Sequence, residues 1–252
     1  MEKIISNIDL HAQIQWVIAI ILSILVIATT TFWIWNKLKP SKLVSEMTLR
    51  TRSWWGMCFV FLFASIVNPI ITYIGLAFLS FFTLREVYTL LKLRDADRTT
   101  LVACYLSIPI QYYFAYQGWY TMFLIFIPVF MFIIIPFLLV LSGDTDDIIR
   151  SMCILPTSLM LGDFGISHLA LLISFPEMND GNISGKALLL FLIFITEAND
   201  IMQFVFGKIF GKHKILPKVS PNKTWEGFIG GVISTTIIGY YMGFLTPLNS
   251  WQ

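Results

Sequence analysis

The sequence has few charged residues. They make up only 13% of the 252 residues, whereas an ordinary soluble domain contains about 25%. Hydrophobic residues make up 57%, and many of them form runs close in length to the roughly 20 residues that cross a bilayer as a helix. This composition argues against a water-soluble single domain and predicts that most of the chain lies in lipid.

Cysteine is also scarce. The three cysteines, Cys58, Cys104 and Cys153, lie in or beside apolar runs, without CxxC spacing or a nearby histidine. This pattern does not suggest a metal site, and we interpret the three as small buried hydrophobic residues. The formal net charge is only +2, which gives no reason to expect a nucleic-acid partner.

Long apolar segments recur along the whole chain. The first is too long for a signal-peptide core and has no clear cleavage site, so we expect it to remain as a helix. The pattern predicts an all-α polytopic membrane protein, a single transmembrane domain of residues 1–252 with about eight transmembrane helices; seven is the alternative. The predicted spans are residues 14–35, 54–67, 70–84, 101–116, 119–141, 152–175, 187–206 and 228–245.

The positive charges predict the orientation. If Met1 faces outward, every lysine and arginine except Lys3 and Lys186 falls on the inner side, as the positive-inside rule requires. We therefore expect a multi-pass protein of the bacterial inner membrane, with any active face on the cytoplasmic side. The basic loops would attract anionic lipid headgroups, although for the loop at residues 36–53 we favour a role in topology alone.

Three acidic residues lie inside predicted spans, where ionisable groups usually mark function or a paired contact. Glu197 and Asp200 are three apart, so they share a helix face and could share a cation or a proton. Asp163 could have such a role or could be hydrogen-bonded to a neighbouring helix. His168 fits a packed, hydrogen-bonded histidine. An ion-coupled transporter that uses these carboxylates is one alternative function.

The segment at residues 200–227 has the most distinctive chemistry. It begins with the membrane-depth carboxylate of Asp200, passes through five lysines and ends in Ser-Pro-Asn-Lys-Thr-Trp-Glu-Gly. Lysines bind phosphate oxygens as point charges, exposed N–H groups at a helix start bind anions, and carboxylates hold the Mg²⁺ that bridges phosphates. The alternative is a lysine-rich loop that only sets topology, followed by a helix start.

Specific residues of this segment resemble a known family. The quoted elements are Asp200, Phe206-Gly207-Lys208, Lys212-His213-Lys214, Pro217-Lys218, Ser220-Pro221, Lys223-Thr224-Trp225-Glu226-Gly227 and Gly230-Gly231. Together they look closely like the cytoplasmic motif of the bacterial phosphatidate cytidylyltransferases, or CDP-diacylglycerol synthases. Arg52-Ser53-Trp54-Trp55-Gly56-Met57 and Phe81-Phe82-Thr83-Leu84-Arg85-Glu86 are similar, more weakly, to a divergent branch of that family.

The resemblance implies a function and roles for individual residues. CMP would pass from CTP to phosphatidate with Mg²⁺, giving CDP-diacylglycerol and pyrophosphate. The implied catalytic residues are Asp200, Lys223 and Glu226, with Asp200 and Glu226 at the metal. The implied substrate-binding residues are Lys212, Lys218, Ser220, Asn222 and Thr224.

The same resemblance leaves alternatives open. The family's further signature, with Lys-Arg, Lys-Asp, His-Gly-Gly and Asp-Arg elements, is expected downstream of residue 252. The chain then fits either a shortened form of the enzyme or a catalytically incomplete membrane partner or regulatory subunit. A homodimer is one of the assemblies that the sequence allows.

Overall fold

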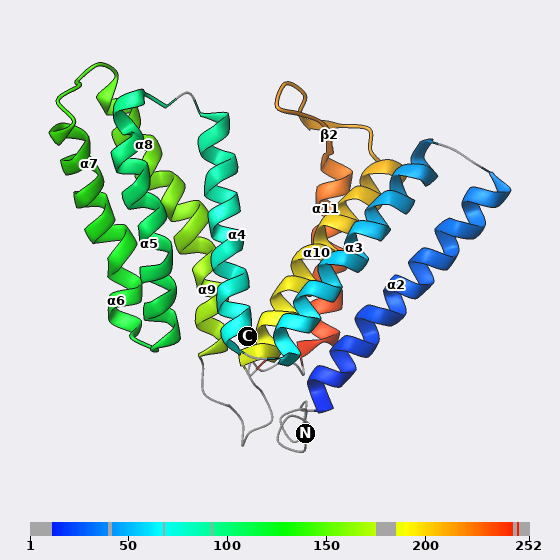
Figure 1. The fold of residues 1–252 in the computed structure, drawn as a ribbon. Helices are drawn as coiled ribbons and strands as arrows, with labels where there is room; N and C mark the ends of the chain where they lie inside the picture. The colour runs from blue at the N-terminus through cyan, green and yellow to red at the C-terminus, as the bar shows by residue number, and fades with distance from the viewer. Residues whose placement is uncertain are drawn as a thin grey trace. The chain divides into compact units, whose positions relative to one another are not determined.

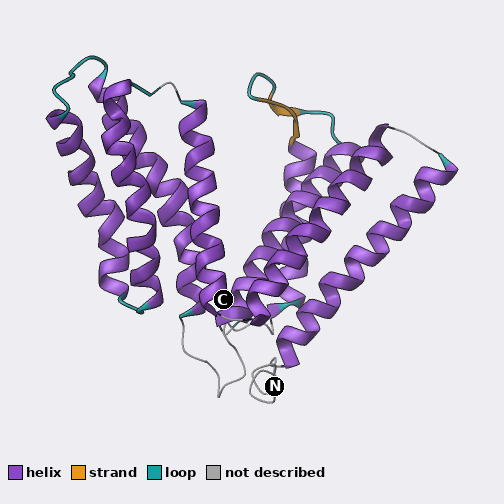
Figure 2. Ribbon diagram, viewed as in Figure 1, coloured by secondary structure: helices purple, strands orange, loops and turns teal. Residues whose placement is uncertain are grey.

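The chain folds into helices that form two compact units. The computed structural model describes residues 12–39, 42–67, 69–91, 93–174, 185–243 and 246. The first unit consists of Met1–Phe59 and Pro176–Gln252, and the second of Val60–Phe175. Helix is the dominant structure in both units (Figure 2). The predicted all-α class is therefore confirmed, with one small β-hairpin added.

The first unit is built around a pair of neighbouring helices. These are α10 (Gly185–Ile209) and α11 (Trp225–Tyr241), which run side by side and are joined by the strands β1 (Lys214–Leu216) and β2 (Ser220–Thr224) (Figure 1). The helix α2 (Ala12–Leu38) packs against α10. The helix α3 (Lys42–Val67) begins in this unit and is tied to α2 by the Trp55 indole N–H, which donates to Thr29 Oγ1 at 2.9 Å.

The second unit is a bundle of helical rods. It contains α4 (Pro69–Leu90), the short 3₁₀ turn η2 (Asp95–Asp97) and α5 (Arg98–Tyr116). Two longer rods follow, each interrupted by a π-helical segment. One is α6, η3 and α7 (Tyr120–Ile125, Phe126–Met131 and Phe132–Leu141), and the other is α8, η4 and α9 (Ile148–Leu159, Met160–Phe164 and Gly165–Ile173). Fully buried side chains, among them Phe123, Ile127, Ile135, Leu139, Leu155 and Leu159, form its core.

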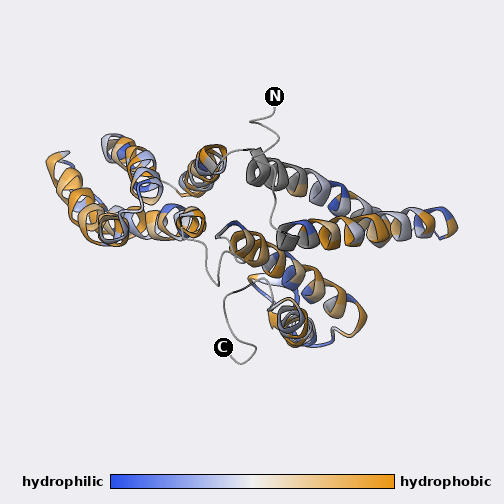
Figure 3. Cartoon of the chain, turned by 90° about the horizontal axis from the view of Figure 1, so that it is seen from below, coloured by the Kyte–Doolittle hydropathy of each residue, from blue (hydrophilic) through white to orange (hydrophobic). Residues whose placement is uncertain are grey.

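Among the residues that the structure describes, five helical rods are long and apolar enough to cross a membrane. They cover residues 18–38, 70–90, 120–141, 148–173 and 185–209, and much of their surface is hydrophobic (Figure 3). The helices α3, α5 and α11 overlap the other three predicted spans. The count of about eight transmembrane helices therefore stays a prediction. Residues 175, 244 and 245, at the ends of two predicted spans, lie outside the described residues.

The cysteines show how burial differs in a membrane protein. Cys104 is buried, as predicted, and Cys58 is partly buried. Cys153 is exposed on α8, so the prediction of burial is wrong for this residue. The cause is that lipid solvates the outer face of an apolar helix, which lets a thiol lie there without a packed neighbour.

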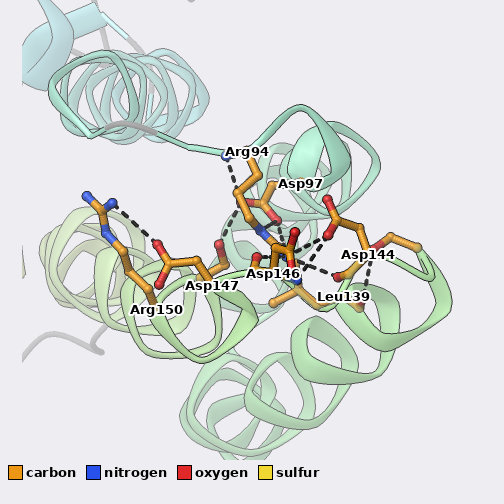
Figure 4. Close-up of polar contacts among 9 residues, drawn as sticks. Arg94, Asp97, Leu139, Asp144, Asp146, Asp147 and Arg150 are labelled. Atoms are coloured by element: carbon orange, nitrogen blue, oxygen red, sulfur yellow. Dashed lines mark hydrogen bonds and ion pairs between the residues drawn. The ribbon is translucent and has the colours of Figure 1, made fainter.

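A polar cluster ties together the loops of the second unit (Figure 4). The carboxylate of Asp97 is fully buried and accepts hydrogen bonds from the Arg94 guanidinium at 2.7 and 3.1 Å and from the Ser151 hydroxyl at 2.6 Å. The same guanidinium donates to the backbone oxygens of Asp144 at 3.0 Å and Asp146 at 2.6 Å. Burial would raise the pKa of Asp97, but the hydrogen bonds from Arg94 and Ser151 hold it below its ordinary value.

Glycines allow α10 and α11 to approach closely. A Cβ atom on Gly227 would lie 2.7 Å from the Gln203 backbone oxygen and 2.9 Å from the Gly207 Cα. A Cβ on Gly231 would overlap the Gln203 side chain. Small residues at such crossings let helix backbones pack directly against each other in membranes. This contact fixes the position along α10 at which α11 packs.

Gly227→Ala should therefore destabilise the first unit. The added methyl group meets backbone atoms, which cannot rotate away, and overpacking of this kind costs roughly 1–3 kcal/mol. Unfolding of the purified protein in detergent measures the effect. Gly239→Ala on the same helix is the matched control, because its Cβ would lie 3.7 Å from Ile195 Cδ1, an ordinary contact. Equal stability of the two variants would contradict the close approach at Gly227.

Candidate functional site

The segment with the most distinctive chemistry forms a β-hairpin between α10 and α11. The strands β1 and β2 are antiparallel, with Lys214 opposite Thr224 and Leu216 opposite Ser220. The backbone N–H of Val219 donates to the Leu216 oxygen at 3.1 Å and closes the turn. Residues that the sequence presents as a loop thus form a paired hairpin, with an irregularity in the register between Lys214 and Leu216.

Glu226 anchors the base of this hairpin. Its carboxylate accepts the backbone N–H of Lys212 at 3.1 Å and of His213 at 3.2 Å, and its Oε1 lies 2.6 Å from Nδ1 of the His213 ring. The hydrogen bond to the His213 ring, followed by these backbone hydrogen bonds, lowers the pKa of Glu226 to about 2. Glu226 is therefore ionised at neutral pH and holds the start of the hairpin against the start of α11.

Thr224 joins the hairpin directly to α11. It is the last residue of β2 and the N-cap of the helix, and its Oγ1 accepts the Gly227 N–H at 3.2 Å. Only 4% of Thr224 is exposed. The Trp225 N–H donates to the His213 oxygen at 2.9 Å, which joins the two ends of the hairpin by a further hydrogen bond. The predicted substrate contact of Thr224 is thus a buried capping hydroxyl.

The other predicted substrate-binding side chains lie on the same hairpin. Lys212, Lys218, Asn222 and Lys223 are exposed and Ser220 is half-buried. Lys223 is exposed directly before the buried Thr224. The hairpin therefore presents several ammonium groups and polar side chains together, as a phosphate-binding element requires.

Asp200 lies apart from Glu226. It is exposed on α10, seven residues before Gly207, which is the residue that packs against Gly227. Seven residues correspond to roughly 10 Å along a helix axis. Within the part of the chain that the structure describes, no recorded contact joins Asp200 to Glu226, so the two predicted metal ligands have separate surroundings.

The donor set around Asp200 fits a phosphate-bound Mg²⁺ better than that around Glu226. Glu197 is exposed one turn from Asp200 on α10 and interacts with it electrostatically. Mg²⁺ on a polyphosphate usually takes one or two protein carboxylates and fills its other positions with phosphate and water. Across the described ranges, no group of three or more His, Cys, Asp or Glu side chains is gathered. Glu226, by contrast, is already hydrogen-bonded to Lys212 and His213.

Two features near the hairpin escaped the sequence analysis. His213 was given no role, although it is the ring partner of Glu226. Arg50 of α3 places its guanidinium 4.8 Å from the Phe204 ring centroid, and Lys208 places its ammonium 5.4 Å from the same centroid. The signal for the second feature was weak, because nothing in the sequence links Arg50 to a residue so far along the chain.

The two residues of the sixth predicted span also have definite places. His168 Nδ1 lies 2.7 Å from the Phe164 oxygen, and its ring packs against Phe123 and Phe164, which confirms the packed histidine. Asp163 is fully buried in the second unit, and its carboxylate has no hydrogen-bond partner among the described residues. Ser107 of the neighbouring helix α5 lies beside this carboxylate, and its hydroxyl donates to the Cys104 oxygen.

The hairpin gives a test of the Glu226 anchor. Glu226→Gln should loosen residues 212–224, because an amide accepts the two backbone N–H groups less strongly than a carboxylate. Since the pKa of Glu226 is depressed to about 2, the anchor is complete above the ordinary glutamate pKa and is lost as the pH falls toward 2. Hydrogen exchange at the Lys212 and His213 amides measures it. Unchanged exchange in the variant would contradict the anchor.

The fold and the site together define a helical membrane protein that carries a cationic hairpin between two closely packed helices. The family model described as the cytidylyltransferase family matches residues 48–252. The chain therefore belongs to the cytidylyltransferase family, which makes it a member of a nucleotidyltransferase family embedded in the membrane.

Similar proteins agree with this assignment. An uncharacterized protein of Escherichia coli K12, YnbB, is 36% identical over 239 residues, which are 93% of this chain and 77% of YnbB. A phosphatidate cytidylyltransferase of Staphylococcus saprophyticus is 35% identical over 77 residues, 31% of this chain and 30% of that protein. That of Staphylococcus haemolyticus is 40% identical over 65 residues, 26% of this chain and 25% of that protein. No solved structure gives a significant match.

Proposed function

We propose that this protein transfers CMP from CTP to phosphatidate, forming CDP-diacylglycerol and pyrophosphate. The observation that carries the proposal is the hairpin, which gathers exposed lysines and polar side chains at one end of two apolar helices in a member of the cytidylyltransferase family. Both substrates are anionic, and one of them is a lipid whose phosphate lies at the membrane surface. A cationic element at a helix end suits both requirements.

The chemistry asks mainly for alignment and charge neutralisation. A phosphate oxygen of phosphatidate attacks the α-phosphorus of CTP, the bond to the β-phosphate oxygen breaks, and pyrophosphate leaves. Holding the two anions together removes much of the entropic barrier, and cations placed where negative charge develops lower the remainder. In this proposal Lys212, Lys218 and Lys223 neutralise the phosphates, while Ser220 and Asn222 donate hydrogen bonds to them.

The remaining residues orient this element or bind the metal. Thr224 and Glu226 hold the hairpin on α11 through the contacts described above, so that its cations keep their register. Asp200, with Glu197 beside it, would hold Mg²⁺. When bound, Mg²⁺ would supply additional positive charge to the phosphates. The reaction would take place at the cytoplasmic face of the bacterial inner membrane, where CTP is available.

A direct assay tests the proposal. Purified protein in lipid nanodiscs receives radiolabelled CTP, phosphatidate and Mg²⁺, and the lipid fraction is analysed for CDP-diacylglycerol. We expect a labelled lipid that requires both substrates. Binding of CTP or phosphatidate without product would favour the alternative function, a regulatory partner that keeps the binding surface. Neither binding nor product would show that the hairpin is not a nucleotide-binding element.

A further inference from the structure

The second unit contains a group of buried oxygen atoms that the proposed function does not use. Both carboxylate oxygens of Asp163 and the side-chain oxygen of Gln111 are buried and have no hydrogen-bond donor among the described residues. Asp163 and Gln111 are themselves 0% exposed. Buried polar atoms without partners are rare in native proteins, because each loses its hydration without compensation.

These atoms lie on two helix faces that meet. On α5, Ser107 and Gln111 are one turn apart, and on η4 and α9, Asp163 and Ser167 are one turn apart. The Gln111 side-chain N–H donates to Ser167 Oγ at 3.2 Å, and Ser107 lies beside the Asp163 carboxyl group. The two pairs are therefore stacked as successive layers between α5 and the rod that contains Asp163.

The hydroxyl groups around these atoms already donate their protons to other acceptors. Ser107 donates to the Cys104 oxygen at 2.7 Å, and Ser167 donates to the Phe164 oxygen at 2.9 Å. Tyr112, which interacts electrostatically with Asp163, donates to the Leu76 oxygen at 2.9 Å, so Ser80 must donate to Tyr112. The Gln111 amide gives its protons to Phe123 and Ser167. Among the described side chains that face Asp163, each of these protons is therefore directed at another acceptor.

The described positive charges of the second unit are also engaged elsewhere. Tyr112 is the titratable side chain that faces Asp163 from α5, and His168, on the same rod as Asp163, is bonded to Phe164. The described arginines of this unit are recorded with other partners: Arg85 with Tyr105, Arg94 with Asp97, Arg98 with Asp95 and Arg150 with Asp147. Among the described residues, no cationic side chain is recorded beside Asp163 to compensate it.

The backbone at this point is unusual as well. Asp163 lies in the π-helical segment η4, which packs against the other π-helical segment of the unit, η3. A π-bulge is rare and frequently marks a functional position in a helix. The residue before Asp163 is Gly162, where a Cβ atom would lie 2.8 Å from Leu84 Cδ2, so α4 closes the third side of the group.

We propose that Asp163 and Gln111, together with the Ser107 and Ser167 oxygens, form a binding site for one monovalent cation, either a proton or a sodium ion. A proton would neutralise the carboxyl group and give it a hydrogen to donate to a neighbouring oxygen. A sodium ion would receive the oxygen ligands that hard cations prefer. The proposal is independent of the hairpin and of cytidylyl transfer, and a failure of either leaves the other standing.

Thermal unfolding of the purified full chain, in detergent and at constant ionic strength, tests the site. A cation that binds only the folded state raises the unfolding temperature by mass action. If sodium binds, the unfolding temperature rises when NaCl replaces choline chloride. If a proton binds, sodium has no effect and the unfolding temperature falls as the pH rises from the ordinary aspartate pKa toward neutral, and then levels off. Asp163→Asn should remove whichever dependence the wild-type chain shows, because the amide carries no charge to neutralise.

A control variant and a second measurement complete this test. Asp95→Asn replaces an exposed aspartate of the same unit and should keep the cation dependence of the wild-type chain. If Asp163→Asn does not fold, infrared spectroscopy of the wild-type chain replaces it. A protonated carboxyl band at neutral pH that persists in sodium supports the proton, and a carboxylate band that shifts on addition of sodium supports the metal. A wild-type chain that shows no dependence in unfolding and neither infrared signature overturns the proposal, as does a dependence that Asp163→Asn retains.

Discussion

Lys223→Ala is expected to abolish the formation of CDP-diacylglycerol, reducing the rate on the order of 100-fold or more, as the loss of one preorganised charge-stabilising group does. Lys223 is exposed on β2, directly before the residue that caps α11. Its backbone therefore has a fixed place relative to the helix. The rate of labelled lipid formation in nanodiscs measures the effect, with membrane insertion checked in parallel.

Lys214→Ala is the matched control for this prediction. Lys214 is an exposed lysine of the neighbouring strand β1, and its removal lowers the charge of the hairpin equally. A selective loss in Lys223→Ala would show that position matters, and an equal loss in both would show that only the summed charge attracts the substrates. Asp200→Asn should also abolish activity, with a loss that excess Mg²⁺ partly restores. Full activity in Lys223→Ala or Asp200→Asn would show that the site lies elsewhere.

Asp97→Asn is expected to destabilise the second unit by roughly 3–5 kcal/mol, the cost of breaking a buried ion pair. The buried carboxylate receives hydrogen bonds from Arg94 and Ser151, and its removal leaves the guanidinium with only the longer 3.9 Å ion pair to the exposed Asp144. Arg94 also holds the backbone of Asp144 and Asp146, so the loop between α7 and α8 should loosen at the same time. Chemical unfolding in detergent, with hydrogen exchange of that loop, measures both effects.

Asp95→Asn is the control for this prediction. Asp95→Asn breaks a pair in which both side chains are largely exposed, and such pairs contribute about 0–1 kcal/mol. Because the pKa of Asp97 is lowered, its contribution is present at neutral pH and is lost as the pH falls below the ordinary aspartate pKa. A wild-type chain and an Asp97→Asn variant of equal stability at neutral pH would show that the cluster does not stabilise the unit.

The helices could be predicted because lipid imposes a simple rule. Each backbone polar group must be satisfied within its own segment, so a long apolar run predicts a helix wherever it occurs. The helix ends were less predictable. α3 begins at Lys42, twelve residues before the predicted span, because a helix continues into the polar region where hydropathy no longer marks it. Arg50 and Arg52 lie in this extension.

The site could be predicted only in part. The sequence shows which residue types are concentrated in the segment, but it does not show which residues contact one another. The lysines of the hairpin were found from their density, but β1 is three residues long and gives no alternating pattern. Its register depends on Glu226 reaching back to Lys212 and His213. The Arg94–Asp97–Ser151 cluster was missed for the same reason, because Ser151 is 54 residues from Asp97.

The junction at Thr224 has a mechanical consequence. No residue separates β2 from α11, so the strand has no flexible linker that would absorb movement. A helix of 17 residues is a rod about 25 Å long, and a small tilt of such a rod displaces whatever is rigidly attached to its end. A change in lipid thickness or chain order that reorients α11 would therefore shift the lysines of the hairpin with it, so that the state of the bilayer acts directly on the proposed phosphate-binding groups.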